Sequence, residues 1–257
     1  MKLIGIAALL ATAGALGCSA NGPAADDPVS RLFENHYQEF VASAGAHHAG
    51  CDVAIRAKGD AGNKRDALTT SVDVDAQGGY RLVREDGSEL IHVGLHAWSK
   101  SRDGKVESRE SGARSDLERD AAVAEWRTVL EPLRDRVKLK KTGSKKLGTR
   151  AVDTWDLTLE PGGDKNGPKV EKGSGKLETD AQTGFPVRVE LTASWSADAP
   201  GGAQGRVNFE IEKMGCAVTE LGKVQKIDAP GETKATPVEA TPTPAAKPSP
   251  KSTKKTR

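Results

Sequence analysis

Two histidines and a cysteine lie close together in the sequence, at His47, His48 and Cys51. Imidazole and thiolate are the ligands that bind zinc. Adjacent histidines project in different directions from an extended backbone, however. Cys51 also has a candidate disulfide partner in Cys216. We therefore expect structural roles for these side chains and predict neither a metal site nor a cofactor.

A nucleophilic hydrolase would carry a serine on a sharp turn, with a base and an acid nearby. The chain contains no Gly-x-Ser-x-Gly motif, and Ser174 stands between Gly173 and Gly175 in a stretch that predicts a mobile loop or a long hairpin over residues 162–175. Carboxylates are numerous, but nothing in the sequence pairs two of them in a cleft. We expect a protein that is not an enzyme.

Cys18 ends an apolar N-terminal segment that follows Met1 and Lys2 and is too short to span a membrane as a helix. The residues Ala15, Leu16 and Gly17 before it resemble the lipobox of bacterial lipoproteins, in which the thiol receives a diacylglycerol and the new N-terminus a further acyl chain such as palmitate. The resemblance implies a signal peptide over residues 1–17 and a lipid anchor at Cys18. The alternative is an ordinary signal peptide cleaved near residue 20, which would remove Cys18.

A lipid anchor would fix where the protein works, because each buried methylene contributes about 0.8 kcal/mol and two or three acyl chains hold stably. Ser19 follows the lipidated cysteine. A non-acidic residue there resembles the pattern of enterobacterial lipoproteins sent to the outer membrane. We expect the periplasmic face of the outer membrane.

The composition suits one domain with a thin aliphatic core, since hydrophobic residues make up 36% of the chain and aromatic residues only 4%. The formal net charge is +2, and acidic and basic residues are interleaved, which argues against a nucleic-acid partner. We assign residues 18–27 to a tether, 28–226 to the domain and 227–257 to a disordered tail rich in proline, lysine and threonine. This basic tail could contact cell-wall polymer or serve only as a solubilising segment.

Two cysteines remain once Cys18 is assigned to lipid, in a chain whose leader sends it to a disulfide-permissive compartment. We predict a disulfide between Cys51 and Cys216, which would join the start of the first strand to the end of the last. Two buried free thiols are the alternative.

The hydrophobic spacing predicts an α+β fold, with two helices packed on antiparallel strands. One helix should begin after the N-cap Asp27 and end near Gly45, and the second should begin near Ser115, run to Val137 and bend at Pro132. Alternation of apolar and polar residues predicts strands at residues 51–55, 72–74, 80–83, 90–93, around 98 and 106, 153–159, 187–195 and 207–211.

This order of helices and strands resembles the LolA, LolB and LppX-like group of periplasmic lipoprotein and lipid carriers. The local patterns are the strand pair at residues 80–83 and 90–94 leading to Trp98, the strand at residues 154–161 that ends in Leu and Pro, and the Asp, Gly, Pro hairpin at residues 180–188. The resemblance covers most of residues 28–216. It implies a curved half-barrel sheet closed by helices, with an apolar interior that accepts acyl chains.

Two functions follow from these patterns. The first is a membrane-anchored envelope lipoprotein that binds a lipid or a lipoprotein segment in an apolar concave face. The alternative is a structural or interaction lipoprotein with a filled core and a basic tail that contacts the cell wall or a partner. An apolar hollow of several hundred cubic ångströms, on the order of a ligand pocket, would favour the carrier.

Overall fold

The computed structural model describes residues 27–34, 36–59, 62–110, 113–163, 167–199 and 205–231. The expected signal peptide, Cys18, the tether up to residue 26 and the tail from residue 232 lie outside the described residues.

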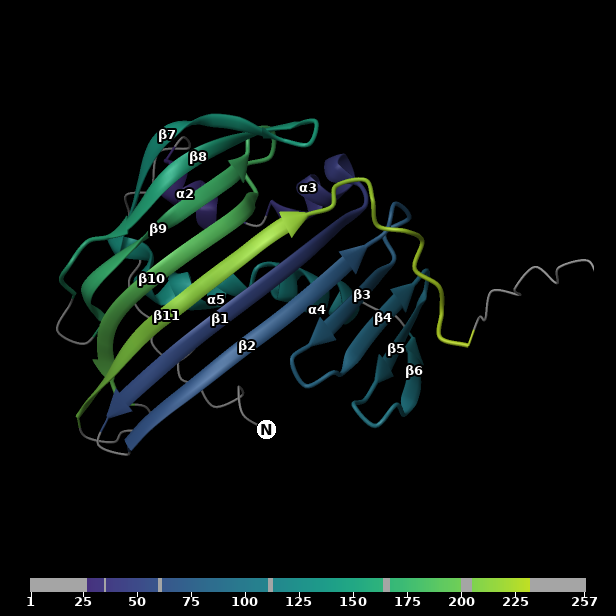
Figure 1. The fold of residues 1–257 in the computed structure, drawn as a ribbon, viewed down its shortest axis with the longest axis horizontal. Helices are drawn as coiled ribbons and strands as arrows, with labels where there is room; N and C mark the ends of the chain where they lie inside the picture. Colours follow the sequence, from purple (N-terminus) through teal and green to yellow (C-terminus); the bar gives the residue numbers. More distant parts are fainter. Residues whose placement is uncertain are drawn as a thin grey trace, which may run out of the picture.

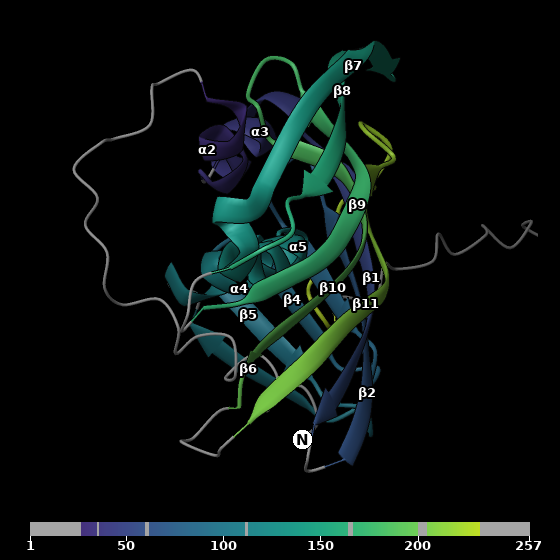
Figure 2. The ribbon, with the colours of Figure 1, turned by 90° about the vertical axis from the view of Figure 1, so that its left-hand side faces the viewer.

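The fold is α+β, as the sequence predicts, with one antiparallel sheet of eleven strands that is curved and not closed into a barrel (Figures 1 and 2). The strands are β1 (His47–Gly59), β2 (Gly62–Val74), β3 (Tyr80–Arg84), β4 (Glu89–Val93), β5 (His96–Lys100), β6 (Val106–Glu110), β7 (Val137–Leu147), β8 (Arg150–Leu159), β9 (Lys169–Asp180), β10 (Pro186–Asp198) and β11 (Arg206–Thr219).

The strand order divides the sheet into two halves that meet at one seam. The order is β6-β5-β4-β3-β2-β1-β11-β10-β9-β8-β7, so each half is a meander of neighbouring strands and only the β1–β11 pair joins them. β1 and β11 are long and lie side by side in the middle of the sheet (Figure 1). The two terminal strands are β6 and β7.

Each of the two predicted helical regions consists of more than one helix. The first contains α2 (Pro28–Phe33) and α3 (Tyr37–Ala44), because Glu34 is extended and ends α2. The second contains α4 (Ala113–Val123), α5 (Glu125–Leu130) and the 3-10 helix η1 (Glu131–Arg136), which carries Pro132. The break after α2 lets Phe33 and Tyr37 enter different clusters of the core.

One prediction about local structure is wrong. Val137 begins strand β7 instead of ending a helix, because η1 stops at Arg136 and Val137 pairs with Leu159. Of the two alternatives for residues 162–175, the structure shows the long hairpin, since residues 169–175 belong to β9, which pairs antiparallel with β8. The glycines of this strand are required by close approach. A Cβ atom at Gly175 would lie 1.9 Å from the carbonyl oxygen of Glu190, and one at Gly173 would lie 2.6 Å from the Leu159 side chain.

The helices lie on the concave side of the sheet and divide the core into two clusters (Figure 2). The tryptophan cluster surrounds Trp126 and Trp195, with strands β7 to β11, β1, α2, α5 and η1. The tyrosine cluster surrounds Tyr37 and Tyr80, with α3, α4, strands β1 to β5 and single residues of β8, β10 and β11.

Candidate functional site

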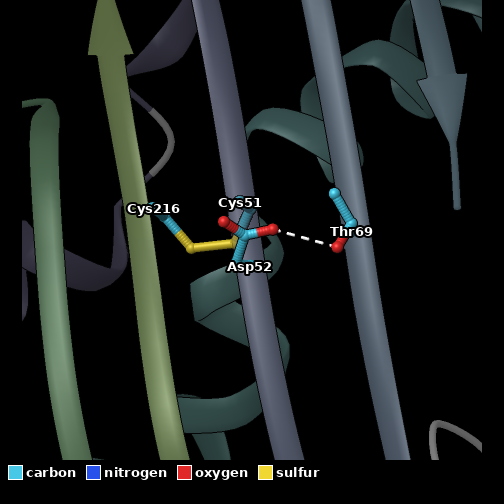
Figure 3. The surroundings of a disulfide bond; sticks show 4 residues. All are labelled: Cys51, Asp52, Thr69 and Cys216. Carbon is cyan, nitrogen blue, oxygen red and sulfur yellow. Dashed lines mark hydrogen bonds between the residues drawn. A yellow bond between two sulfur atoms is a disulfide. The ribbon is translucent and has the colours of Figure 1, made fainter.

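The predicted partners Cys51 and Cys216 lie directly opposite each other across the seam and form a disulfide (Figure 3). Their Cα atoms are 4.0 Å apart, and both residues are buried. On the neighbouring residue, Asp52 accepts a hydrogen bond from the Thr69 hydroxyl at 2.9 Å. The disulfide therefore links β1 to β11, the strand pair at which the two halves of the described sheet meet.

His47 and His48 point away from each other, as alternation along β1 requires. His48 Nδ1 lies 2.7 Å from a carboxylate oxygen of Asp73, whereas His47 is fully buried beside Tyr37. Among the residues that the structure describes, no group of three or more histidine, cysteine, aspartate or glutamate side chains could hold a metal ion.

The hydrogen bonds of His47 define its tautomer. Nδ1 lies 2.7 Å from the carbonyl oxygen of Gly45, which can only accept, so Nδ1 carries the proton. Nε2 then accepts from the Tyr37 hydroxyl at 3.0 Å. Burial lowers the pKa of His47 and raises that of Tyr37, and the nearby Arg119 adds to the lowering at His47. This pair fastens α3 to β1.

The concave face is filled where α5 and η1 cover it. Trp126, Leu130 and Leu133 are at most 1% exposed and belong to the tryptophan cluster. The space left between Trp126 and strands β1, β10 and β11 is about 10 Å³. A space of that size holds about one water molecule and no acyl chain.

Two indole N–H groups in this interior, Nε1 of Trp126 and Nε1 of Trp195, have no hydrogen-bond partner among the residues that the structure describes. Trp195 stacks on Phe209 with ring centres 5.3 Å apart. Buried donors are normally satisfied by protein or ordered water. These two atoms are therefore the places in the concave core where a hydrogen-bond acceptor would be stabilised.

A groove of about 700 Å³ lies on the other face of the sheet, between strands β2 to β6 and the segment that follows β11. Its walls mix apolar residues such as Ile91 and Ile227 with charged ones. Glu89 accepts hydrogen bonds from Arg81 at 2.8 Å and Lys100 at 2.9 Å. The bond from Arg81 holds the pKa of Glu89 below its ordinary value against the effect of burial, and Lys100 acts in the same direction.

The buried Asp75 holds the segment after β11 against the sheet. Its carboxylate accepts backbone hydrogen bonds from Gln77 at 2.9 Å, Gly79 at 2.8 Å and Ile227 at 2.9 Å. Ile227 is the residue at which the sequence predicts the tail to begin. The tail therefore leaves the domain at the outer face of strands β2 to β5, and this segment can be followed in Figure 1.

A smaller pocket of about 180 Å³ lies between α2 and the strands β7 to β9. Leu139, Trp155 and Leu32 are among its apolar walls, and Arg31 and Asp153 line it as well. The Trp155 indole donates to the Thr179 hydroxyl at 3.1 Å. The sequence alone does not predict this pocket, because Trp155 has the pattern of an ordinary core residue there.

Charges of both signs line the smaller pocket: Arg31 is basic, and Asp153 and Asp180 are acidic. Lys141 lies 5.7 Å from the centre of the Trp155 ring and forms an ion pair with Asp153 at 2.8 Å. Hydrogen bonds from Lys141 and Ser144 lower the pKa of Asp153. The Arg31 guanidinium lies against Gly184 and is exposed.

None of the described helices is both long and apolar enough to cross a bilayer. Cys18, the expected lipidation site, lies outside the described part of the chain, so the anchor remains a prediction from sequence.

No protein-family model and no curated protein sequence matches this chain. The solved structures that it resembles include MucB, at 17% identity and a TM-score of 0.29, over 79% of this chain and 62% of that one. A complex titled MucA/MucB from Pseudomonas aeruginosa matches at 16% identity and a TM-score of 0.27, over 78% of this chain and 60% of that one. This chain therefore spans about three fifths of the length of those MucB chains.

A LolA superfamily protein from Nitrosomonas europaea also matches, at 11% identity and a TM-score of 0.26, over 80% of this chain and 96% of that one. The group that the sequence resembles is thus among the structural neighbours. All of these TM-scores are far below 0.5, so the alignments carry no conclusion about what this chain binds.

Proposed function

We propose that this chain is a lipid-anchored protein of the bacterial cell envelope whose half-barrel is a filled scaffold that acts by contacting another macromolecule through its surface. The observation that carries this proposal is the tight packing under α5 and η1, where Trp126, Leu130 and Leu133 are at most 1% exposed and the space between Trp126 and strands β1, β10 and β11 is about 10 Å³. A carrier needs room for an acyl chain, and typical ligand pockets measure about 300–1,000 Å³. Of the two larger pockets lined by described residues, the groove of about 700 Å³ lies on the outer face and the pocket of about 180 Å³ lies beside α2 at the concave side, and both are partly lined by charged residues.

Native mass spectrometry of the protein purified from its own membranes tests the filled interior. We expect the mass of the processed and acylated chain with nothing else bound, and no binding of a fluorescent fatty acid. A copurifying lipid that survives delipidation of the anchor, together with saturable fatty-acid binding, would overturn the proposal.

The anchor has its own test. Cys18→Ser should release the protein from membranes into the soluble fraction and change its processing. A serine variant that fractionates with membranes and has the processed mass of the parent would contradict lipidation at Cys18.

The basic tail supplies a second surface for contact. Lys251, Lys254, Lys255 and Arg257 give it positive charge, which suits anionic cell-wall polymer or lipid headgroups. Deletion of residues 232–257 should abolish retention on isolated cell walls, and unchanged retention would rule out this role.

A carrier function is the second candidate, and the unpartnered N–H groups of Trp126 and Trp195 favour it. A lipid ester could satisfy both donors if α5 moved away from the sheet. The fatty-acid experiment distinguishes the candidates, and Trp195→Phe should weaken fatty-acid binding only if the chain is a carrier.

A further inference from the structure

The terminal strand β7 combines an open sheet edge with an unusual concentration of positive charge. It is 11 residues long and pairs only with β8 within the sheet. Its lysines are Lys138, Lys140, Lys141, Lys145 and Lys146, and all of them are exposed. A terminal strand carries a row of backbone N–H and C=O groups that can pair with another extended chain.

Part of this charge has no partner. Lys138, Lys141 and Lys145 form ion pairs with Glu160, Asp153 and Glu178 respectively. Among the described residues, Lys140, Lys146 and the nearby Arg31 form no ion pair. The residue across from Lys140 is Asp156, which is engaged by Lys176 instead. The edge therefore keeps a net positive charge.

The smaller pocket opens beside the same strand. Leu139 of β7 is one of its walls, and Trp155 lies on β8 opposite Lys141. A residue added across from Leu139 would have its Cβ atom about 5 Å from that side chain. Its side chain would point to the pocket, while its two neighbours would point to the outer face, where Lys138 and Lys140 lie.

We propose that β7 is a docking edge for an acidic, extended peptide segment of a partner protein, which adds as a strand and places one apolar or aromatic side chain in the Trp155 pocket. The matching pattern is acidic, apolar, acidic. At about 180 Å³ the pocket is smaller than a typical small-molecule site and suits a single side chain. The lysines oppose neutral or basic strands and select acidic ones.

A second copy of this chain is a poorer occupant of the same edge. Pairing β7 with β7 would bring two lysine-rich strands together, and like charges placed opposite each other destabilise a strand pair. A dimer in sedimentation that dissociates when Lys140 and Lys146 are changed to glutamate, without any peptide binding, would overturn the proposal.

The test uses the full mature protein and a synthetic nonapeptide with blocked ends, in which glutamate alternates with valine around one central phenylalanine. Isothermal titration should give micromolar binding that weakens with added salt. The same peptide with lysine in place of glutamate should not bind, and alanine in place of phenylalanine should weaken binding about tenfold. N-methylation of alternate backbone amides should abolish binding if strand addition is the mode.

On the protein side, the double variant Lys140→Glu with Lys146→Glu should weaken binding about tenfold or more. The matched control is Lys58→Glu with Lys213→Glu, which makes the same charge change at exposed positions of β1 and β11 and should alter affinity less than about twofold. These substitutions are all on the surface, so both variants should fold. Equal weakening by both pairs would overturn the proposal.

Hydrogen exchange locates the bound peptide. Backbone amides of residues 137–147 should exchange more slowly when the peptide is present. Protection confined to the groove between β2–β6 and the segment after β11 would overturn the assignment to β7.

This inference rests on the proposed surface function, and the two can fail separately. If the protein binds neither the peptide nor a fatty acid, only the proposal of a docking edge at β7 is refuted. If the protein binds the peptide and also carries lipid, only the proposal of a filled scaffold is refuted.

Discussion

The two clusters of the core sit side by side under one sheet, yet they are held together differently. The tryptophan cluster is almost wholly apolar, and Trp126 Nε1 and Trp195 Nε1 within it have no hydrogen-bond partner in the described part of the chain. The tyrosine cluster contains buried polar side chains that are engaged. Tyr37 donates to His47, and Arg119 lies over the rings of Tyr37 and Tyr80 at 5.5 and 5.7 Å.

This difference indicates what each cluster depends on. Apolar packing depends on shape and volume and is insensitive to pH. A buried polar network depends on every partner being present and in the right protonation state, because an unpaired group in a low dielectric is costly. The tryptophan cluster should therefore respond most to loss of volume, and the tyrosine cluster to loss of a partner or a change in pH.

Breaking the seam between the halves should have the largest effect. The Cys51–Cys216 disulfide spans a sequence separation of 165 residues. The chain-entropy relation gives about 5 kcal/mol for a loop of this size, as an upper figure. Replacement of both cysteines by alanine should lower the free energy of unfolding by about 3–5 kcal/mol in a urea titration. Coincident urea curves for the oxidised and reduced parent protein would contradict this prediction.

Loss of volume in the tryptophan cluster comes next. Leu130 is fully buried in α5, and Leu130→Ala should cost about 2–5 kcal/mol of unfolding free energy. Leu117 in α4 is 66% exposed, so the matched change Leu117→Ala should cost less than about 0.5 kcal/mol. Chemical denaturation of both variants checks the pair. Similar losses in the two proteins would mean that α5 does not pack as described.

Loss of one hydroxyl tests the tyrosine cluster. Tyr37→Phe removes the donor to His47 and leaves a buried ring nitrogen unsatisfied, which should cost about 1–3 kcal/mol. The control Trp195→Phe removes an N–H that has no partner, so its cost should reflect lost volume alone. Calorimetric melting of the two variants, each compared with the parent protein, gives the measurement. A neutral Tyr37→Phe would show that the bond stabilises nothing.

The pH dependence should be the smallest effect and should come from His47. Burial lowers its pKa in the folded state below the ordinary 6.5, so the unfolded chain binds the proton more readily. Its stability contribution is therefore complete above about pH 6.5 and falls as the pH drops from there towards the lowered folded-state pKa.

Unfolding free energies measured across this window should show the fall in the parent protein. His47→Gln should flatten the profile in this range, whereas His96→Gln, at an exposed position of β5, should leave it unchanged. A slope that survives His47→Gln would assign the effect to other groups.

Much of the fold could be predicted because the signals are local. The alternation at Cys51, Val53 and Ile55 reflects one buried face of β1, and the start of α2 follows from Asp27, which accepts hydrogen bonds from Val29 and Ser30. The cysteine pairing was predictable from number and compartment, and the structure joins the predicted partners.

The elements that were missed lack such a signal. β7 has few apolar residues along its length, since a terminal strand with lysines on it shows little hydrophobic alternation. For β9 the sequence left a mobile loop and a long hairpin open, because Gly173 and Gly175 suit both, and the structure shows the hairpin, in which neighbouring strands approach these glycines closely. The smaller pocket could not be predicted for the same reasons, because its walls come from both of these strands. Leu139 lies on β7 and Thr179 on β9.

By itself the sequence determined the α+β class and most strands, because each depends on residues close together in the chain, whereas the export leader and the lipidation of Cys18 stay predictions. Only the tertiary structure decided that α5 fills the concave face, that β7 ends the sheet, and that Trp155 lines a pocket. Those outcomes depend on which distant side chains meet and how much space they leave. Hydrophobic periodicity specifies which face of an element is buried, but the volume between two such faces exists only once they are packed together.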